Sequence, residues 1–225
     1  MMVDTAERLR DVAREIKPHL RGWLHLGVFP LSVAAGIVLV ALSPTSTTRI
    51  ATAIFASTAA LLFGVSALYH RRHWSPRADG LLRRLDHSNI FLLIAGTYTP
   101  FAIILLSGRN AQILLWLVWG GALVGIAFRV LWIGAPRWLY LPVYVALGWA
   151  AVFWMGDLAS AAGPAAFTLI VLGGALYSVG GLVYGLKRPN PAPRWFGFHE
   201  VFHSFTIAAF AVHYIGVSMV VYAAR

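Results

Sequence analysis

Two histidines four residues apart, His199 and His203, lie at the start of the last long apolar stretch of this sequence. Residues at positions i and i+4 share one face of a helix, so both imidazoles can point at the same ion. A third histidine, His70, ends the second apolar stretch. Three imidazoles with a fourth position left open are a common ligand set for catalytic zinc. The sequence contains no cysteine, so a metal in this protein must be bound by histidine, aspartate or glutamate.

Two further polar residues accompany these histidines. Asp86 begins the third apolar stretch, and Ser66 lies one helical turn before His70 on the same face. A zinc ion bound by the histidines would lower the pKa of a bound water to about 7 and so produce a nucleophile at neutral pH. Asp86 could accept the proton of that water, and Ser66 could orient a ligand or stabilise a developing oxyanion. We therefore expect Asp86 and Ser66 to be catalytic residues.

Two alternative interpretations of this cluster must be weighed. Residues 199–203 match the short H-E-x-x-H signature of zinc metalloproteases, in which Glu200 would be the general base. The third histidine and the aspartate favour a three-histidine site instead, with Glu200 about 100° around the helix from His199. A histidine within a membrane can also simply hydrogen-bond a neighbouring helix. Four such residues at one depth favour function, because ionisable groups inside membranes are usually functional.

The other histidines are weaker candidates. His213 follows His203 by ten residues, or about 15 Å along a helix, which is too far to share its ion. We expect His213 to pack between helices. The remaining four lie in or beside loops and are expected at the membrane interface: His19, His25, His73 and His87.

The composition is that of an integral membrane protein with one domain. Of the 225 residues, 59% are hydrophobic and 12% are charged, whereas soluble domains are typically about 45–50% apolar and about 25% charged. A spanning helix needs about 20 mostly apolar residues. The sequence therefore predicts an all-α bundle of seven transmembrane helices, at residues 23–43, 50–70, 87–106, 112–132, 138–156, 164–186 and 199–222.

The basic residues predict the orientation of this bundle. The net charge of +10 comes from residues between the apolar stretches, which indicates topology signals and contacts to anionic lipids rather than nucleic-acid binding. Residues 1–22 are expected to form a cytoplasmic segment that includes an amphipathic helix, followed by the transmembrane domain of residues 23–225. With a cytoplasmic N-terminus and an extracytoplasmic C-terminus, only three of the 18 basic residues lie outside: Arg49, Arg109 and Arg225. This topology brings His70, Asp86, His199 and His203 to one depth near the cytoplasmic face.

These residues also carry a resemblance to a known family. Ser66-Ala67-Leu68-Tyr69-His70, Leu85-Asp86-His87-Ser88 running into Ala95-Gly96-Thr97-Tyr98-Thr99-Pro100, and Phe198-His199-Glu200-Val201-Phe202-His203 resemble the bacterial hemolysin III proteins. These belong to the progestin and adipoQ receptor superfamily, which includes the adiponectin receptors and is distantly related to alkaline ceramidases. The resemblance covers nearly the whole chain, including Lys17-Pro18-His19-Leu20-Arg21-Gly22-Trp23.

The resemblance implies a seven-helix bundle that binds zinc on its cytoplasmic side. His70, His199 and His203 match the family's zinc ligands, and Asp86 and Ser66 match its aspartate and serine. The chain lacks the long N-terminal domain of the eukaryotic receptors, which argues against a hormone-receptor role. Related members are linked to hydrolysis of ceramide-type amides, and bacterial members to haemolysis and membrane fluidity.

The sequence thus predicts a zinc-dependent hydrolase of the cell (inner) membrane that acts on a lipid amide or ester. Its partners would be membrane lipids. The first alternative is a non-enzymatic protein that perturbs or senses the membrane and uses zinc as a structural staple. The second is a receptor or transporter, which would need a polar path to the outer face.

Overall fold

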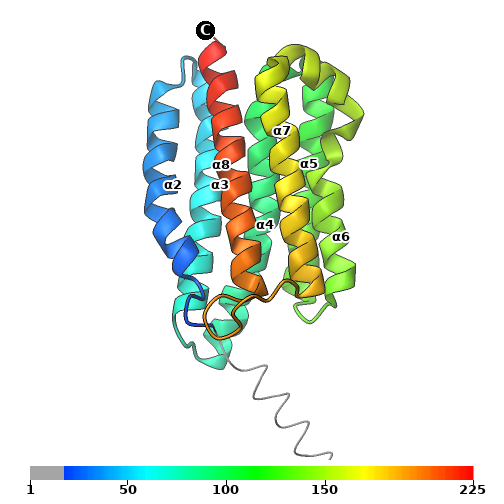
Figure 1. Ribbon diagram of the computed structural model, residues 1–225. Helices are drawn as coiled ribbons and strands as arrows, with labels where there is room; N and C mark the ends of the chain where they lie inside the picture. Colours follow the sequence, from blue (N-terminus) through cyan, green and yellow to red (C-terminus); the bar gives the residue numbers. More distant parts are fainter. Residues whose placement is uncertain (1–17, 225) are drawn as a thin grey trace, which may run out of the picture.

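The computed structural model describes residues 18–224, and the regular structure in this range is helical, apart from an isolated β-bridge between Ala192 and Phe196. The helices run side by side along one axis as a bundle (Figure 1). Most of the first 22 residues, including the predicted amphipathic helix, lie outside the described residues. In chain order the elements are α2 (Trp23–Leu42), α3 (Ser46–Arg71), α4 (Pro76–Leu105), α5 (Gly108–Leu131), α6 (Arg137–Gly148), the 3-10 helix η1 (Ala150–Trp154), α7 (Met155–Leu186) and α8 (Phe198–Ala223).

The described part of the chain contains six segments long and apolar enough to cross a membrane, which confirms a multi-pass membrane protein. Large apolar side chains such as Trp116, Leu123 and Val124 point outwards from α5 and are exposed. An apolar exterior of this kind is stable only in contact with lipid, because a soluble protein would bury such a surface. Four of the six segments agree closely with predicted spans, and a fifth, Pro76–Leu105, agrees at its end but not at its start.

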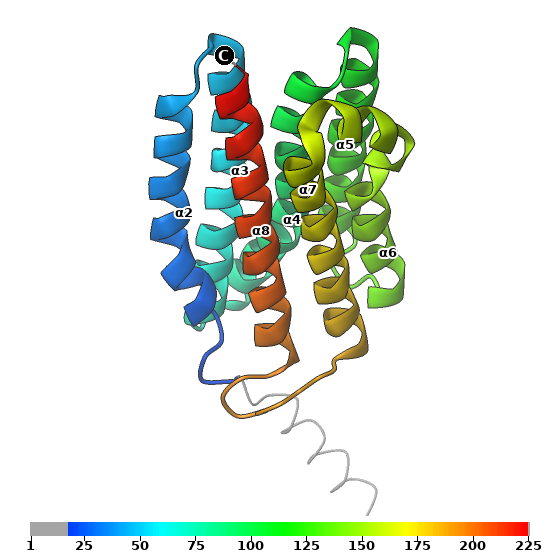
Figure 2. The ribbon, with the colours of Figure 1, turned by 45° about the horizontal axis from the view of Figure 1, so that its top comes forward.

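The sixth segment, Arg137–Leu186, covers 50 residues and folds back on itself. It consists of α6, η1 and α7, and Figure 2 shows α6 and α7 side by side. Its two ends lie close together, as shown by a hydrogen bond of 3.3 Å from the Arg137 guanidinium to the Tyr184 carbonyl. Within α7 the chain kinks at Gly163, which has a φ of 71° that glycine tolerates, just before Pro164. The predicted stretches 138–156 and 164–186 correspond to the two arms of this hairpin.

One predicted boundary is wrong by several helical turns. The third span was expected to begin at residue 87, but α4 begins at Pro76. Ser75 caps the helix by accepting a hydrogen bond from the Ala78 amide at 3.4 Å, Pro76 occupies the first turn, and Asp79 adds a favourable negative charge there. These signals lie in a polar segment that the hydropathy argument assigned to a loop. Asp86 therefore lies inside α4 rather than at its start.

Helix α4 lies at the centre of the bundle and packs against α3, α5 and α8. Small residues permit these close approaches: a Cβ on Gly96 would lie 2.1 Å from the Thr58 hydroxyl oxygen of α3. Similarly, a Cβ on Gly125 of α5 would lie 2.3 Å from the Phe91 ring of α4. Gly96 and Gly125 thus act as packing residues between neighbouring helices.

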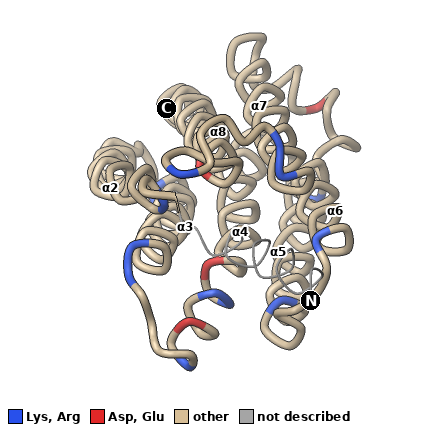
Figure 3. The backbone as a smooth tube through the Cα atoms, turned by 60° about the horizontal axis from the view of Figure 1, so that its bottom comes forward, with Lys and Arg blue, Asp and Glu red and all other residues tan. Residues whose placement is uncertain are grey.

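Basic residues gather at one end of the bundle (Figure 3). This is the end at which α3, α5 and α7 finish and α4, α6 and α8 begin, and we call it the basic end. Of the lysines and arginines in residues 18–224, only Arg49 and Arg109 lie at the opposite end. Those at the basic end are Arg21, Arg71, Arg72, Arg77, Arg83, Arg84, Arg129, Arg137, Lys187, Arg188 and Arg194.

Candidate metal centre

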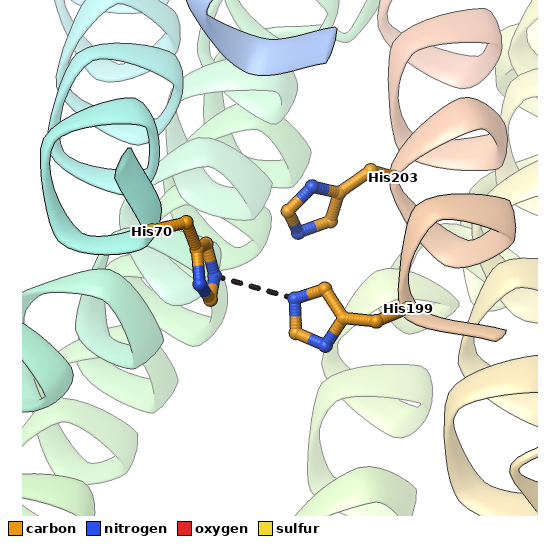
Figure 4. A group of neighbouring side chains, drawn as sticks. All are labelled: His70, His199 and His203. Carbon is orange, nitrogen blue, oxygen red and sulfur yellow. Dashed lines mark hydrogen bonds between the residues drawn. The ribbon is translucent and has the colours of Figure 1, made fainter. Parts of the chain in front are cut away.

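The three predicted ligands meet at the basic end of the bundle. His70 comes from the last turn of α3, whereas His199 and His203 come from the first two turns of α8. Their rings face one another across the space between the two helices (Figure 4). One nitrogen from each ring lies within 4.8 Å of the others. The side chains of His70 and His203 are buried, and that of His199 is partly buried.

This donor set fits a tetrahedral zinc ion. Two nitrogens that each bind zinc at about 2.0–2.1 Å lie roughly 3.3 Å apart in tetrahedral geometry. The Nε2 atoms of His70 and His199 are 3.2 Å apart, close to that separation. His203 needs only a small ring movement to complete the set, since its nearest nitrogen is within 4.8 Å of the others. Three neutral imidazoles could therefore hold one metal ion and leave a fourth position open.

Asp86 and Ser66 lie beside the three histidines. The Asp86 Oδ2 atom is 3.7 Å from His70 Nε2, which is an ion-pair distance but too long for a direct hydrogen bond. Ser66, one turn deeper on α3, is buried and lines the same cavity as Asp86. The structure thus brings all five predicted site residues together. Their catalytic roles remain a proposal.

The Glu200 carboxylate is occupied by partners other than the histidines. One carboxylate oxygen forms an ion pair with the Arg21 guanidinium, and the other accepts a hydrogen bond from the Gly197 amide at 2.8 Å. The second contact caps the N-terminus of α8. With both oxygens engaged and only 1% of the residue exposed, Glu200 stabilises the fold. The geometry therefore favours the three-histidine site over the metalloprotease alternative.

His25 was expected at the membrane interface, and that expectation is wrong. It lies on α2, is 2% exposed, and stacks on the His203 ring with centroids 3.8 Å apart and planes 9° apart. No hydrogen-bond partner of either ring nitrogen lies within residues 18–224. Its position in the first turn of the first predicted span, near the depth of the three histidines, was the available sequence signal. Because α2 is apolar on all sides, the sequence does not indicate which of its faces turns towards the bundle interior, and packing against the other helices determines that the face with His25 does so.

The position of His87 also differs from the expectation, and the burial of Arg129 is a further finding. His87 lies within α4 and lines the same cavity as the site rather than facing a loop. Arg129 lies in the last turn of α5 and is 1% exposed, with its guanidinium 4.2 Å from the Tyr140 ring centre. The ring carries a negative face that stabilises the cation. By contrast, His19 and His73 are exposed, as expected.

An apolar cavity extends from the three histidines into the bundle. Asp86, Ser66, His199 and His203 line it at the basic end. His213 of α8 lines it deeper, about 15 Å further along the helix. Most of the wall between them is apolar or aromatic, as in sites that bind small molecules. A hydrocarbon chain could lie in this cavity with its polar end beside the histidines.

The segment before α2 and the loop between α7 and α8 lie over the basic end. The amide of His19 donates to the Arg194 carbonyl at 2.9 Å, and that of Leu20 donates to the Trp195 carbonyl at 3.2 Å. Gly22 has a φ of 80° and lies so close to α3 that a Cβ would be 2.8 Å from the His70 Cβ. These contacts hold the segment directly beside His70, on one side of the candidate site.

Comparison with known proteins agrees with this geometry. The model of the family described as "Haemolysin-III related" matches residues 14–214. The chain belongs to the haemolysin-III family. This family is part of the progestin and adipoQ receptor superfamily.

Two bacterial relatives show how closely other haemolysin-III proteins match. The chain is 36% identical over 158 residues to the hemolysin-3 homolog of Bacillus subtilis (strain 168), covering 70% of this chain and 71% of that protein. It is 31% identical over 210 residues to hemolysin-3 of Bacillus cereus, covering 92% of this chain and 93% of that protein. The matched family range includes the whole candidate metal centre, since it contains Ser66, His70, Asp86, His199 and His203.

Proposed function

We propose that this haemolysin-III protein is a zinc-dependent hydrolase that acts on a lipid amide or ester in the cell membrane. One observation carries the proposal: a buried three-histidine cluster stands at the polar end of an otherwise apolar cavity, beside a carboxylate and a hydroxyl. A zinc ion with a purely structural role would need the three histidines but neither the cavity nor the two additional polar residues. The cavity and the two additional polar residues are the parts that a hydrolase requires.

His70, His199 and His203 would hold the zinc ion in this proposal. Zinc supplies a Lewis acid for the scissile carbonyl and lowers the pKa of a water at its open position. Asp86 would accept a proton at its Oδ2 atom, which already faces the His70 ring. Ser66 would orient the Asp86 carboxylate through its hydroxyl. The apolar cavity wall would align the acyl chain and exclude bulk water from the carbonyl.

The proposal includes a seven-span topology with the N-terminus in the cytoplasm. α6 has 12 residues and η1 has five, so together they extend about 28 Å, close to the hydrocarbon thickness of about 30 Å. The part of α7 after Gly163 is long enough for the returning span. Since basic residues gather at the end that holds the histidines, that end would face the cytoplasm. The active site would then act on lipids of the inner leaflet.

The direct test is hydrolysis by purified protein in lipid nanodiscs. The probes are an N-acylsphingosine and an ester with the same acyl chain, with release of the free fatty acid followed by mass spectrometry. Wild-type protein should release fatty acid from at least one probe, and chelation of zinc should abolish the release. Retained turnover in the His203→Ala variant, or no turnover of either probe by zinc-loaded protein, would reject the hydrolase.

A second candidate is a non-enzymatic membrane protein with structural zinc. The observation that favours it is the name hemolysin-3 carried by the Bacillus cereus relative, which points to membrane damage by that protein. Under this alternative, added protein should release a dye from phosphatidylcholine vesicles, and Asp86→Asn should release it equally well. The vesicle assay and the hydrolysis assay therefore separate the two candidates.

A further inference from the structure

The deep part of the cavity holds two polar atoms that lack partners. No partner of His213 Nδ1 or of the Tyr177 hydroxyl lies within the described residues, although both atoms are buried. His213 comes from α8 and Tyr177 from α7, and both residues line the cavity. Their ring centroids are 5.7 Å apart. An unpaired buried polar atom is costly, so two of them beside one cavity indicate a binding site for a polar group.

The hydrogen-bonding character of this pair is fixed by its surroundings. His213 Nε2 lies 3.1 Å from the Ile170 carbonyl oxygen. Because a carbonyl only accepts hydrogen bonds, Nε2 carries the proton and Nδ1 of the neutral ring is an acceptor. The ring is also held in place, since a Cβ on Gly173 would lie 2.2 Å from it. A ligand at this position must therefore donate to His213.

We propose that His213 and Tyr177 form a subsite that binds a hydroxyl group on the chain of a long-chain acyl lipid. A hydroxyl can donate to His213 Nδ1 and accept from the Tyr177 hydroxyl, so it satisfies both atoms at once. A carbonyl could accept from Tyr177 but would leave His213 Nδ1 unpaired. A plain hydrocarbon chain would leave both atoms unpaired.

The position of the subsite sets where the hydroxyl must lie. His213 follows His203 by ten residues, which is about 15 Å along α8. An extended hydrocarbon advances roughly 1.25 Å per carbon, from bonds of about 1.5 Å. The subsite therefore lies about 12 carbons from a carbonyl placed at the three histidines. This inference rests on the proposed placement of the acyl chain in the cavity, but it does not require hydrolysis.

Competition binding to immobilised wild-type protein in detergent micelles tests the proposal. Radiolabelled stearate is the tracer, and the competitors are stearate, 12-hydroxystearate and 2-hydroxystearate. One or two buried hydrogen bonds should make 12-hydroxystearate bind about five- to tenfold more tightly than stearate. The 2-hydroxy acid should show no such gain, because its hydroxyl would remain beside the three histidines.

Three variants link this preference to the subsite. Tyr177→Phe removes one oxygen atom and should reduce the preference below about twofold while leaving stearate binding unchanged. His213→Leu should lose the preference as well. Tyr214→Phe is the matched control, because the Tyr214 hydroxyl donates to the Ala35 carbonyl at 2.9 Å, away from the cavity. This control should keep the wild-type preference for 12-hydroxystearate. Because all variants are measured in the same micelles, differences in how the acids enter the micelles cancel when a variant is compared with wild type.

Each remaining outcome has a definite meaning. Equal binding of stearate and 12-hydroxystearate to wild type would overturn the proposal and indicate that water fills the subsite. A preference that survives both Tyr177→Phe and His213→Leu would also overturn it, as would failure of every acid to compete. A preference that depends on Tyr177 in a protein that hydrolyses no lipid would support the subsite and reject the hydrolase.

Discussion

Arg21 and Glu200, which are 179 residues apart in the sequence, form an ion pair that joins the segment before α2 to the first turn of α8. The pair holds the start of α8, and hence His199 and His203, against the segment that lies over the basic end. It also explains why an H-E-x-x-H pattern occurs here without protease geometry. The glutamate is required for the fold of the site rather than for proton transfer.

The Glu200→Gln substitution should therefore destabilise the protein without removing its metal. Loss of a mostly buried ion pair leaves the Arg21 charge uncompensated and costs about 3 kcal/mol. We expect a lower melting temperature with about one zinc per chain retained, measured by differential scanning fluorimetry and elemental analysis. Arg21→Gln should lower the melting temperature similarly, and the double variant should add little. An unchanged melting temperature with complete loss of turnover would instead support Glu200 as a general base.

Single substitutions of the three histidines should abolish metal binding. Purified protein should contain about one zinc per chain, and His70→Ala, His199→Ala and His203→Ala should each lose it, because the remaining two imidazoles form an incomplete ligand set. His73→Ala is the matched control, since this histidine is exposed three residues after His70. His213→Ala should also retain zinc. Elemental analysis that finds full occupancy in the His203→Ala variant would contradict the assignment.

The proposed topology can be tested with cysteines, because the natural chain has none. Arg109→Cys and Arg188→Cys place single thiols at exposed positions at opposite ends of the bundle. In intact cells a membrane-impermeant maleimide should label position 109 but not position 188, and permeabilisation should expose both. A reporter fused after Arg225 should likewise be extracytoplasmic. Labelling of position 188 in intact cells would show that the protein has the opposite orientation.

Hydropathy predicts much of this fold, because each span is a continuous apolar stretch. It misses the start of α4, where Ser75 and Pro76 begin the helix in a polar segment. It also predicts the hairpin arms of residues 137–186 but not η1, whose tighter turns depend on local packing. Helix ends outside the apolar stretch depend on capping residues, which a count of apolar residues ignores.

The convergence of His70, His199 and His203 was predictable, because helical spacing and loop charges placed them at one depth. The burial of His25 and Arg129 was not, because their helices are apolar on all sides and the sequence does not indicate which face turns inwards. Both residues are positioned by aromatic rings of other helices, His203 for one and Tyr140 for the other. The proposed hydroxyl subsite was not predictable from the sequence either, because it depends on how α7 and α8 are aligned beside each other.

Asp86→Asn distinguishes a catalytic zinc from a structural one. The Asp86 carboxylate is 3.7 Å from His70 Nε2 and is not among the three ligands that converge on the site, so the ion should not depend on it. Asparagine has the same shape but cannot accept a proton. The variant should keep one zinc per chain and its melting temperature, yet lose about 100- to 10,000-fold in turnover of a lipid amide. Elemental analysis, scanning fluorimetry and fatty-acid release should be measured on the same preparation.

Asp79→Asn is the control for this last prediction, because Asp79 is an exposed acid in the first turn of the same helix. It should leave zinc content and turnover unchanged. Loss of zinc in the Asp86→Asn variant would make Asp86 a ligand or a support for one, as the structural alternative requires. Turnover equal to that of wild type would remove Asp86 from the mechanism. If zinc and fold persist while turnover falls, the carboxylate moves a proton, and the three histidines hold a catalytic ion.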